Sequence, residues 1–295
     1  MANSFERDIS PESKDFGKNV EIMLKFIRHG ERSKDGKLTD YGRSVTAERA
    51  RQSEFKKEDF DAVKAIGSNA GSKNEKGMAR SLESADIYAH EIAGDEQFVT
   101  RSQKILNYEN FVSKEPFDWA EVYNSNLPAD FETLSDDEKA AAGKKAQTAT
   151  VNHLITLDTP EAQAMRQEAA GSFAFLIDHY MKMAKKLKSE SKVLIPAGTH
   201  GGVMEFVLQQ ALVRKDEDGK EVVGFKDIAD IGGEFSPSEG YNVDIATDEE
   251  GKPTDLKVSF DNENRPALRD AHLDVAKLEE LKDLYAKLHG LEGVE

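Results

Sequence analysis

The chain has 295 residues, no cysteine and a formal net charge of −16. It can therefore form no disulfide, thiol nucleophile or thiolate metal site. The negative charge also disfavours nucleic acid and anionic membranes as partners, because both attract clustered cations. Residues 1–19 form a polar lead-in without the apolar core of a signal peptide, and no apolar run approaches the ~18 residues that span a bilayer. We expect a cytoplasmic protein in which residues 20–295 form one domain.

Strands and helices are predicted to alternate along the chain. Apolar runs rich in β-favouring residues predict strands at 20–27, 62–68, 98–105 and 192–198. Helical patterns and caps predict helices at 39–56, 77–92, 159–187, 203–213 and 268–288. Two further runs, 241–247 and 256–260, flank the turn residues 248–252 and predict a hairpin.

Residues 110–160 differ from the rest of the chain. They contain Trp119, two prolines, an acidic cluster at 136–138 and Ala/Lys-rich stretches, which favour an insertion of short helices over sheet. The alternation of strands and helices around this insertion predicts an α/β protein. We expect a three-layer α/β/α sandwich with a mostly parallel central sheet and an inserted helical cap.

Two histidines each follow a predicted strand directly. His29 lies in Arg28-His29-Gly30-Glu31 after the first strand, and His200 lies in Thr199-His200-Gly201-Gly202 after the strand at 192–198. Ligands of open α/β sheets bind beyond the carboxyl ends of the strands. Each histidine also precedes a glycine, which lets the backbone approach a ligand closely. The sequence therefore predicts that these two segments share one site.

The residue types in these segments suit phosphoryl transfer. Displacing an alkoxide from a phosphomonoester requires a nucleophile, cations beside the phosphoryl oxygens and an acid for the leaving group. His29 can attack through one ring nitrogen while the other donates a hydrogen bond. Arg28 supplies a planar donor fork that matches phosphate oxygens, and Arg32 can add a second.

Three blocks of sequence together resemble the histidine phosphatase superfamily, in its phosphoglycerate mutase-like branch. The first is Arg28-His29-Gly30-Glu31 with Leu38-Thr39-Asp40-Tyr41-Gly42. The second is Gly67-Ser68-Asn69 with the segment 78–86, which contains Arg80 and Ser84-Ala85, and the third surrounds His200. The blocks occur in the family order and span residues 22–212. Each block alone is a weak signal, but the combination is specific.

The resemblance implies a metal-independent phosphatase that passes through a phosphohistidine at His29. It implies that Arg28, Arg80 and His200 hold the phosphate, and Arg32 resembles a second arginine of the acid-phosphatase branch. The substrate would be a phosphorylated small molecule, and no metal or organic cofactor is expected. The apolar stripe of 268–288 suits either core packing or a homodimer.

The proton donor is the least defined residue of the predicted site. The acid-phosphatase branch has a His-Asp pair in its third block, whereas here His200 is followed by glycine. The other branch places a glutamate after the third strand, and the chain offers Glu109 one residue out of register. We therefore predict Glu109 as the acid and catalytic partner of His29 and His200. The alternatives are Glu115, Asp118 and Glu121.

Two other functions share this sequence signature. A phosphoglycerate or phosphosugar mutase is disfavoured, because only residues 32–37 separate the first motif from Leu38 and they contain no tryptophan. A phosphoryl-ligand-binding module that has lost its acid is the alternative outside the enzymes. Specificity is expected in residues 110–160 and in a lip at 69–77. No role is predicted for the remaining histidines, His90, His153, His179, His272 and His289.

Overall fold

The computed structural model describes residues 16–94, 96–107, 111, 117–216, 218–260, 265 and 270–293. Its strands are β1 (Glu21–Arg28), β2 (Ala62–Gly67), β3 (Val99–Ser102), β4 (Lys192–Thr199), β5 (Leu212–Lys215), β6 (Glu221–Val223), β7 (Gly240–Ala246), β8 (Leu256–Phe260) and β9 (His272–Leu273). Its α-helices are α1 (Asp40–Gln52), α2 (Arg80–Ala93), α4 (Trp119–Ser125), α5 (Asp136–Thr156), α6 (Pro160–Ala184), α7 (Met204–Ala211) and α8 (Val275–His289). The protein is therefore of the α/β class, as predicted.

The described strands form one mixed sheet in the order β3-β2-β4-β1-β7-β8-β9-β5-β6. Only β3, β2, β4 and β1 run parallel, and every other pairing is antiparallel. The prediction of a mostly parallel sheet is wrong. After α7 the chain continues through tight turns at 216–220 and 248–252 instead of crossover helices, and a tight turn can only join antiparallel neighbours.

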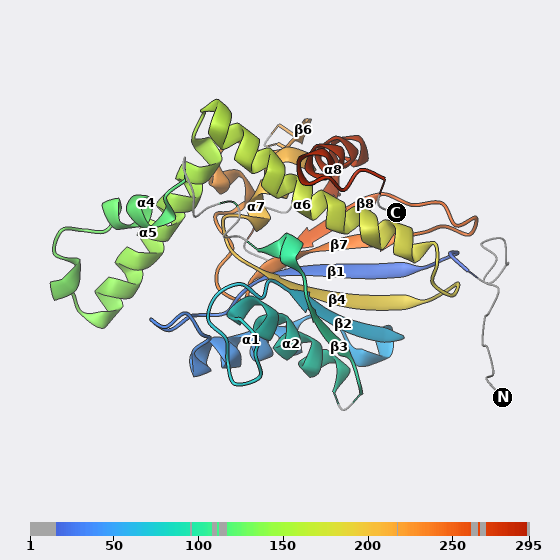
Figure 1. Ribbon diagram of the computed structural model, residues 1–295, viewed down its shortest axis with the longest axis horizontal. Coiled ribbons are helices and arrows are strands. Elements are labelled where there is room, and N and C mark those ends of the chain that lie inside the picture. The colour runs from blue at the N-terminus through green and yellow to red at the C-terminus, as the bar shows by residue number, and fades with distance from the viewer. Residues whose placement is uncertain are drawn as a thin grey trace.

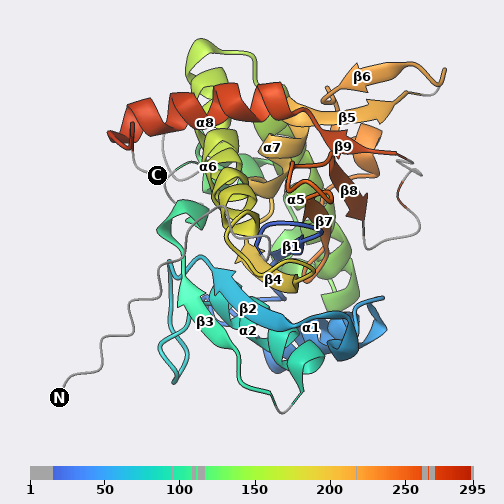
Figure 2. The ribbon, with the colours of Figure 1, turned by 90° about the vertical axis from the view of Figure 1, so that its right-hand side faces the viewer.

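Helices cover both faces of the parallel half of the sheet. Figure 1 shows α6 and α8 above the sheet and α1 and α2 below it. Alternate residues of β1 serve the two faces, because Phe26 joins the core cluster that contains α6 while Ile27 packs in the cluster with Tyr88 of α2. The predicted burial of this strand on both faces is confirmed. Figure 2 shows β5 and β6 at the edge of the sheet far from α1 and α2.

The element boundaries follow the predictions most closely where a cap is present. Thr39 accepts a hydrogen bond from Gly42 N at the start of α1, and Thr159 does so from Ala162 N at the start of α6. The helix predicted at 268–288 begins at residue 275, because Asp274 caps it and the residues before it pair with β5 and β8 as β9. The three short strands β5, β6 and β9 were not predicted.

The insertion is helical, as predicted, but its helices are not all short. It contains α4, a 3-10 turn (Phe131–Thr133) and the 21-residue α5, which starts with a capping box of Ser135 and Glu138. Figure 1 shows α4 and α5 extending beyond one end of the sheet. Across the described segments, no helix combines the length and apolarity needed to cross a bilayer.

Candidate active site

His29 and His200 lie next to each other at the carboxyl ends of β1 and β4. The two strands pair in parallel with Arg28 opposite Thr199, so the residues that follow them emerge side by side. His29 N donates to Thr199 O across this pair at 3.0 Å. The two imidazole rings have centroids 5.0 Å apart, and both residues are buried. The predicted convergence of the first and third motifs is confirmed.

The hydrogen bonds of His29 define its tautomer. Its Nδ1 lies 2.7 Å from Gly30 O, which can only accept, so Nδ1 carries the proton. The unprotonated nitrogen is then Nε2, which holds the lone pair that a nucleophile needs. Gly30 N in turn donates to Ser84 Oγ at 3.1 Å, which fixes the turn that follows the histidine. His29 is thereby held in the form suited to attack on phosphorus.

His200 is held by two residues of the first turn of α2. Its Nε2 lies 3.0 Å from Ser81 Oγ, whose hydroxyl lies 3.2 Å from Thr199 O and donates to it. On the other side of the ring, Arg80 Nη2 donates to Nδ1 at 3.4 Å. These contacts place the proton on Nε2 and direct Nδ1 toward the Arg80 guanidinium. Ser81 was not singled out from the sequence.

Both histidines are neutral in the free protein near pH 7. Burial lowers the pKa of His29 well below 6.5, and the charges of Arg80, Arg28 and Arg32 lower it further. The pKa of His200 is also well below its ordinary value, through burial first and then through His29 and the same arginines. All three predicted arginines therefore act electrostatically on both rings. The site is a buried, cation-rich cluster in which the nearby carboxylates act on Arg28.

Helix α2 brings Arg80 to this pocket because glycines let it approach the sheet closely. A Cβ at Gly198 would overlap the carbonyl oxygen of Ser81, and one at Gly67 would lie 2.8 Å from Leu82 Cα. Arg80 is the first residue of the helix and is buried, and its Nη1 donates to Gly36 O at 3.4 Å. Arg80 is therefore brought into contact with His200.

Arg28 reaches the site from the end of β1. Its Nη1 donates to Phe235 O at 2.5 Å and lies 3.7 Å from Glu234 Oε2. Its Nε is buried and has no hydrogen-bond partner among the described residues. A Cβ at Gly201 would lie 3.0 Å from this nitrogen, so the guanidinium packs against the turn that follows His200. A buried donor left open beside two histidines is what an anion-binding site requires.

Two short hairpins flank Arg80 at the mouth of the site. Arg32 pairs with Leu38 in the first, and Lys73 pairs with Ala79 in the second. The second hairpin is the predicted lip, and it is ordered by Asn69 Oδ1, which accepts from Ala79 N at 2.7 Å. Arg32 is exposed, so it adds charge at the rim of the pocket, whereas Arg28 and Arg80 lie inside.

Glu205 is a buried acid beside the site that the sequence prediction missed. It lies on the first turn of α7, where its Oε2 accepts from Gly202 N at 2.7 Å and its Oε1 from Phe235 N at 3.4 Å. Burial raises its pKa to about 7, against the opposing charge of Arg28. A carboxylate five residues after His200, on an apolar helix, was the available signal.

The predicted proton donors are only partly described by the structure. Glu109 and Glu115 lie outside the described residues. Asp118 caps α4 by accepting from Glu121 N at 3.0 Å, and Glu121 itself is exposed. Among the described residues, no carboxylate forms a hydrogen bond with His29. Trp119, which follows Asp118 in the sequence, packs against the third motif. A Cβ at Gly202 would lie 3.0 Å from the Trp119 ring.

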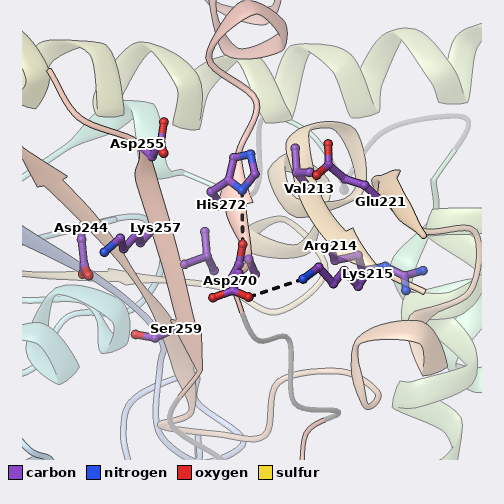
Figure 3. Close-up of a pocket in the computed structure, with 12 residues that line it drawn as sticks. Val213, Arg214, Lys215, Glu221, Asp244, Asp255, Lys257, Ser259, Asp270 and His272 are labelled. Atoms are coloured by element: carbon purple, nitrogen blue, oxygen red, sulfur yellow. Dashed lines mark hydrogen bonds and ion pairs between the residues drawn. The ribbon is translucent and has the colours of Figure 1, made fainter. Parts of the chain in front are cut away.

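A cavity on the antiparallel half of the sheet differs from the site around His29 in the charges of its lining residues. This cavity of about 570 Å³ lies over β5, β8 and β9 (Figure 3). Its charges have both signs and are partly paired, because Lys215 Nζ lies 3.6 Å from Asp270 Oδ2. Arg214 is likewise engaged with Asp230 at 3.3 Å. Within the described ranges no cluster of three or more His, Asp or Glu side chains has the geometry to hold a metal ion.

Comparisons with known proteins do not assign the chain to a family. No family model matches the chain, and no curated protein matches it in sequence.

Proposed function

We propose that the protein is a phosphomonoester phosphatase of the histidine phosphatase type that acts without a metal through a phosphohistidine at His29. The observation that carries this proposal is the pairing of a neutral His29, with its Nε2 lone pair free, and a buried Arg28 Nε that has no partner among the described residues. A nucleophile and an open cationic donor in one buried pocket suit a phosphoryl dianion. Helices on both faces of the sheet fit the three-layer arrangement that the resemblance implies.

In the first step, His29 Nε2 attacks phosphorus and the bond from phosphorus to the ester oxygen breaks. The N–P bond that forms leaves a phosphohistidine, and the leaving alkoxide takes a proton from a carboxylic acid. Arg28, Arg80 and the rim residue Arg32 stabilise the negative charge on the equatorial oxygens. His200 binds the same group once the dianion raises the pKa of its ring, because a nearby anion favours the protonated imidazole.

In the second step, water attacks the phosphohistidine and releases inorganic phosphate. The carboxylate that gave up its proton in the first step takes one from this water, which restores the acid. Glu109 remains our proposal for this residue. Glu115, Asp118 and Glu121 are the alternatives, and Asp118 would have to exchange its capping role for a contact with substrate.

The test is acid–base quenching of the enzyme with p-nitrophenyl phosphate. We expect a phosphoenzyme that is stable in alkali and labile in acid, together with release of inorganic phosphate. His29→Ala should reduce turnover by about a thousandfold or more and abolish the phosphoenzyme, because the nucleophile is lost. His90→Ala, at an exposed position on α2, is the matched control and should retain turnover. Near-normal turnover in His29→Ala would disprove the nucleophile assignment.

A phosphoryl-ligand-binding module is the second candidate. It is favoured by the lack of any described carboxylate that hydrogen-bonds His29. Such a module would bind inorganic phosphate but form no phosphohistidine with any ester. Screening sugar phosphates, nucleotides, inositol polyphosphates and phosphopeptides for phosphate release distinguishes the two candidates, and detection of an isomerised phosphoester would instead indicate a mutase.

A further inference from the structure

Arg265 is a buried arginine that belongs to none of the sequence motifs. Its side chain is 3% exposed, and its donors converge on the single loop 231–239. Nη1 donates to Ile231 O at 2.6 Å and to Gly233 O at 2.8 Å, and Nη2 donates to Glu234 O at 3.0 Å. The guanidinium carbon also lies 4.0 Å from the ring centroid of Phe235.

The charge of Arg265 is matched within the same loop. Its Nε donates to Glu239 Oε1 at 2.8 Å, and both side chains are almost fully buried. Glu239 Oε2 accepts from Ser236 N at 2.7 Å, so this carboxylate ties the guanidinium to the backbone of the loop. A buried pair with its remaining acceptors filled holds a defined geometry, and removal of one partner leaves the other uncompensated.

The same loop also holds Arg28. Phe235 O accepts the 2.5 Å hydrogen bond from Arg28 Nη1, and the Glu234 carboxylate lies 3.7 Å from the same nitrogen. The backbone of Arg28 is tied to the loop as well, because Ser238 N donates to Arg28 O at 3.0 Å and Arg28 N to Glu239 O at 2.9 Å. Two buried arginines therefore bind one loop through different groups of its backbone and side chains.

The loop also connects this clamp to the helical insertion. The Glu234 carboxylate accepts from Gln147 Nε2 at 2.9 Å and from Thr148 Oγ1 at 3.1 Å, both on α5. The carbonyl of Glu234 is one of those that Arg265 binds. Arg265 thus holds the backbone carbonyl of Glu234, whereas α5 and Arg28 contact its carboxylate.

We infer that Arg265 is a positioning residue for phosphate binding, acting through the loop 231–239 on Arg28. The inference rests on the proposed function, because it assigns Arg28 Nε to the phosphate. The hydrogen bond from Arg28 Nη1 to Phe235 O orients the planar guanidinium group. The direction of the buried Arg28 Nε therefore depends on the position of the loop. Without Arg265, three loop carbonyls and the Glu239 carboxylate lose their donor, and the carbonyl that anchors Arg28 shifts with them.

Arg265→Lys is the test, with Arg166→Lys as the matched control. Lysine keeps the charge opposite Glu239 but cannot form the planar fork. Arg166 is an equally buried arginine that also donates to two backbone carbonyls, of Leu154 and Leu157, away from the loop. Both variants should lose stability in urea, because each gives up buried hydrogen bonds to backbone carbonyls. Arg265→Lys alone should weaken binding of inorganic phosphate by roughly tenfold, measured by calorimetry, because a charge-assisted hydrogen bond is displaced.

Two further readouts separate positioning from a general loss of structure. The NMR cross-peak of Arg28 Nε–H, assigned by its disappearance in Arg28→Lys, should move in Arg265→Lys and stay in place in Arg166→Lys. The double variant Arg28→Lys with Arg265→Lys should bind phosphate no more weakly than Arg28→Lys alone, because both changes act on one contact. If Arg265→Lys does not fold, Glu239→Gln should move the same cross-peak.

The possible outcomes distinguish failure of the inference from failure of the proposed function. An unmoved Arg28 cross-peak, or additive losses in the double variant, would overturn the inference even if the wild type forms a phosphohistidine. A wild type that binds phosphate in an Arg265-dependent manner but never forms a phosphohistidine would overturn the phosphatase and leave the inference standing. If the wild type binds no phosphate, both fail.

Discussion

At the scale of single residues, burial controls the ionisation of the site. His29 and His200 are kept neutral by burial and by the arginines around them, so their pKa values lie well below 6.5. Glu205 is shifted the other way, with a pKa of about 7. One pocket therefore holds neutral bases beside fixed guanidinium charges, the arrangement that favours nucleophilic attack on an anion over simple protonation.

Glu205 gives a prediction for the dependence of stability on pH. Its pKa is near 4.5 in an unfolded chain and about 7 in the folded one, so its contribution to stability is full below pH 4.5 and lost as the pH rises through 7. Glu205→Gln does not ionise. Relative to the wild type, its free energy of unfolding should therefore rise by about 2.5 kcal/mol between pH 5 and pH 8.

Urea unfolding at both pH values measures this difference directly. Glu279→Gln, at an exposed position on α8, is the control and should follow the wild-type pH dependence. A constant offset between Glu205→Gln and the wild type at pH 5 and pH 8 would show that Glu205 does not carry the shift.

At the scale of elements, close contact between α2 and the ends of β2 and β4 sets the geometry of the pocket. Ser81 and Arg80 contact His200 from the first turn of α2, and Ser84 holds the backbone of Gly30 from the next. Gly198 makes this approach possible, because no other residue fits beneath the backbone of Ser81. The helix therefore positions parts of all three motifs at once.

Gly198→Ala should displace α2 and disturb the pocket. Its Cβ would overlap a backbone carbonyl, so we expect a loss of about 2 kcal/mol or more in the free energy of unfolding. Phosphate affinity should fall as well, because Arg80 and Ser81 move with the helix. Gly143→Ala in α5 is the control, since its Cβ meets only the tip of the Tyr123 side chain, and it should be neutral or slightly stabilising. Wild-type stability and affinity in Gly198→Ala would contradict this account.

At the scale of the whole molecule, the site lies where the two halves of the sheet meet. The histidines follow β1 and β4 of the parallel half, whereas the loop 231–239 that holds Arg28 leads into the antiparallel β7. The chain has a net charge of −16, so the cationic site belongs to a protein that is strongly acidic as a whole. Local convergence of arginines, and not overall charge, would attract a phosphorylated substrate.

We predict that prolonged dialysis against EDTA leaves phosphatase turnover unchanged. The reason is that Arg28, Arg80 and Arg32 supply the positive charge that phosphoryl transfer requires. Turnover of p-nitrophenyl phosphate before and after dialysis is the measurement. Loss of turnover that added Mg²⁺ or Zn²⁺ restores would show that a metal supplies this charge instead.

Local sequence was sufficient for the half of the candidate site that contains the two histidines. The apolar runs that became β1 and β4 fixed where Arg28, His29 and His200 emerge, and the capping residues Thr39 and Thr159 fixed the starts of α1 and α6. These features depend on burial patterns and hydrogen bonds within a few residues. They can therefore be predicted from a single sequence.

Tertiary structure alone decided the support of the site and three strands of its sheet. The strands β5, β6 and β9 are two to four residues long, too short for a periodic pattern. The strand β9 pairs with β5, which is distant in the sequence, and β6 pairs with β5 across a hairpin. Arg265 and Glu205 likewise act through backbone groups of the loop 231–239, which lies about 30 residues from each. Contacts from a side chain to a distant backbone leave no sequence pattern, so only the folded chain reveals what orients Arg28.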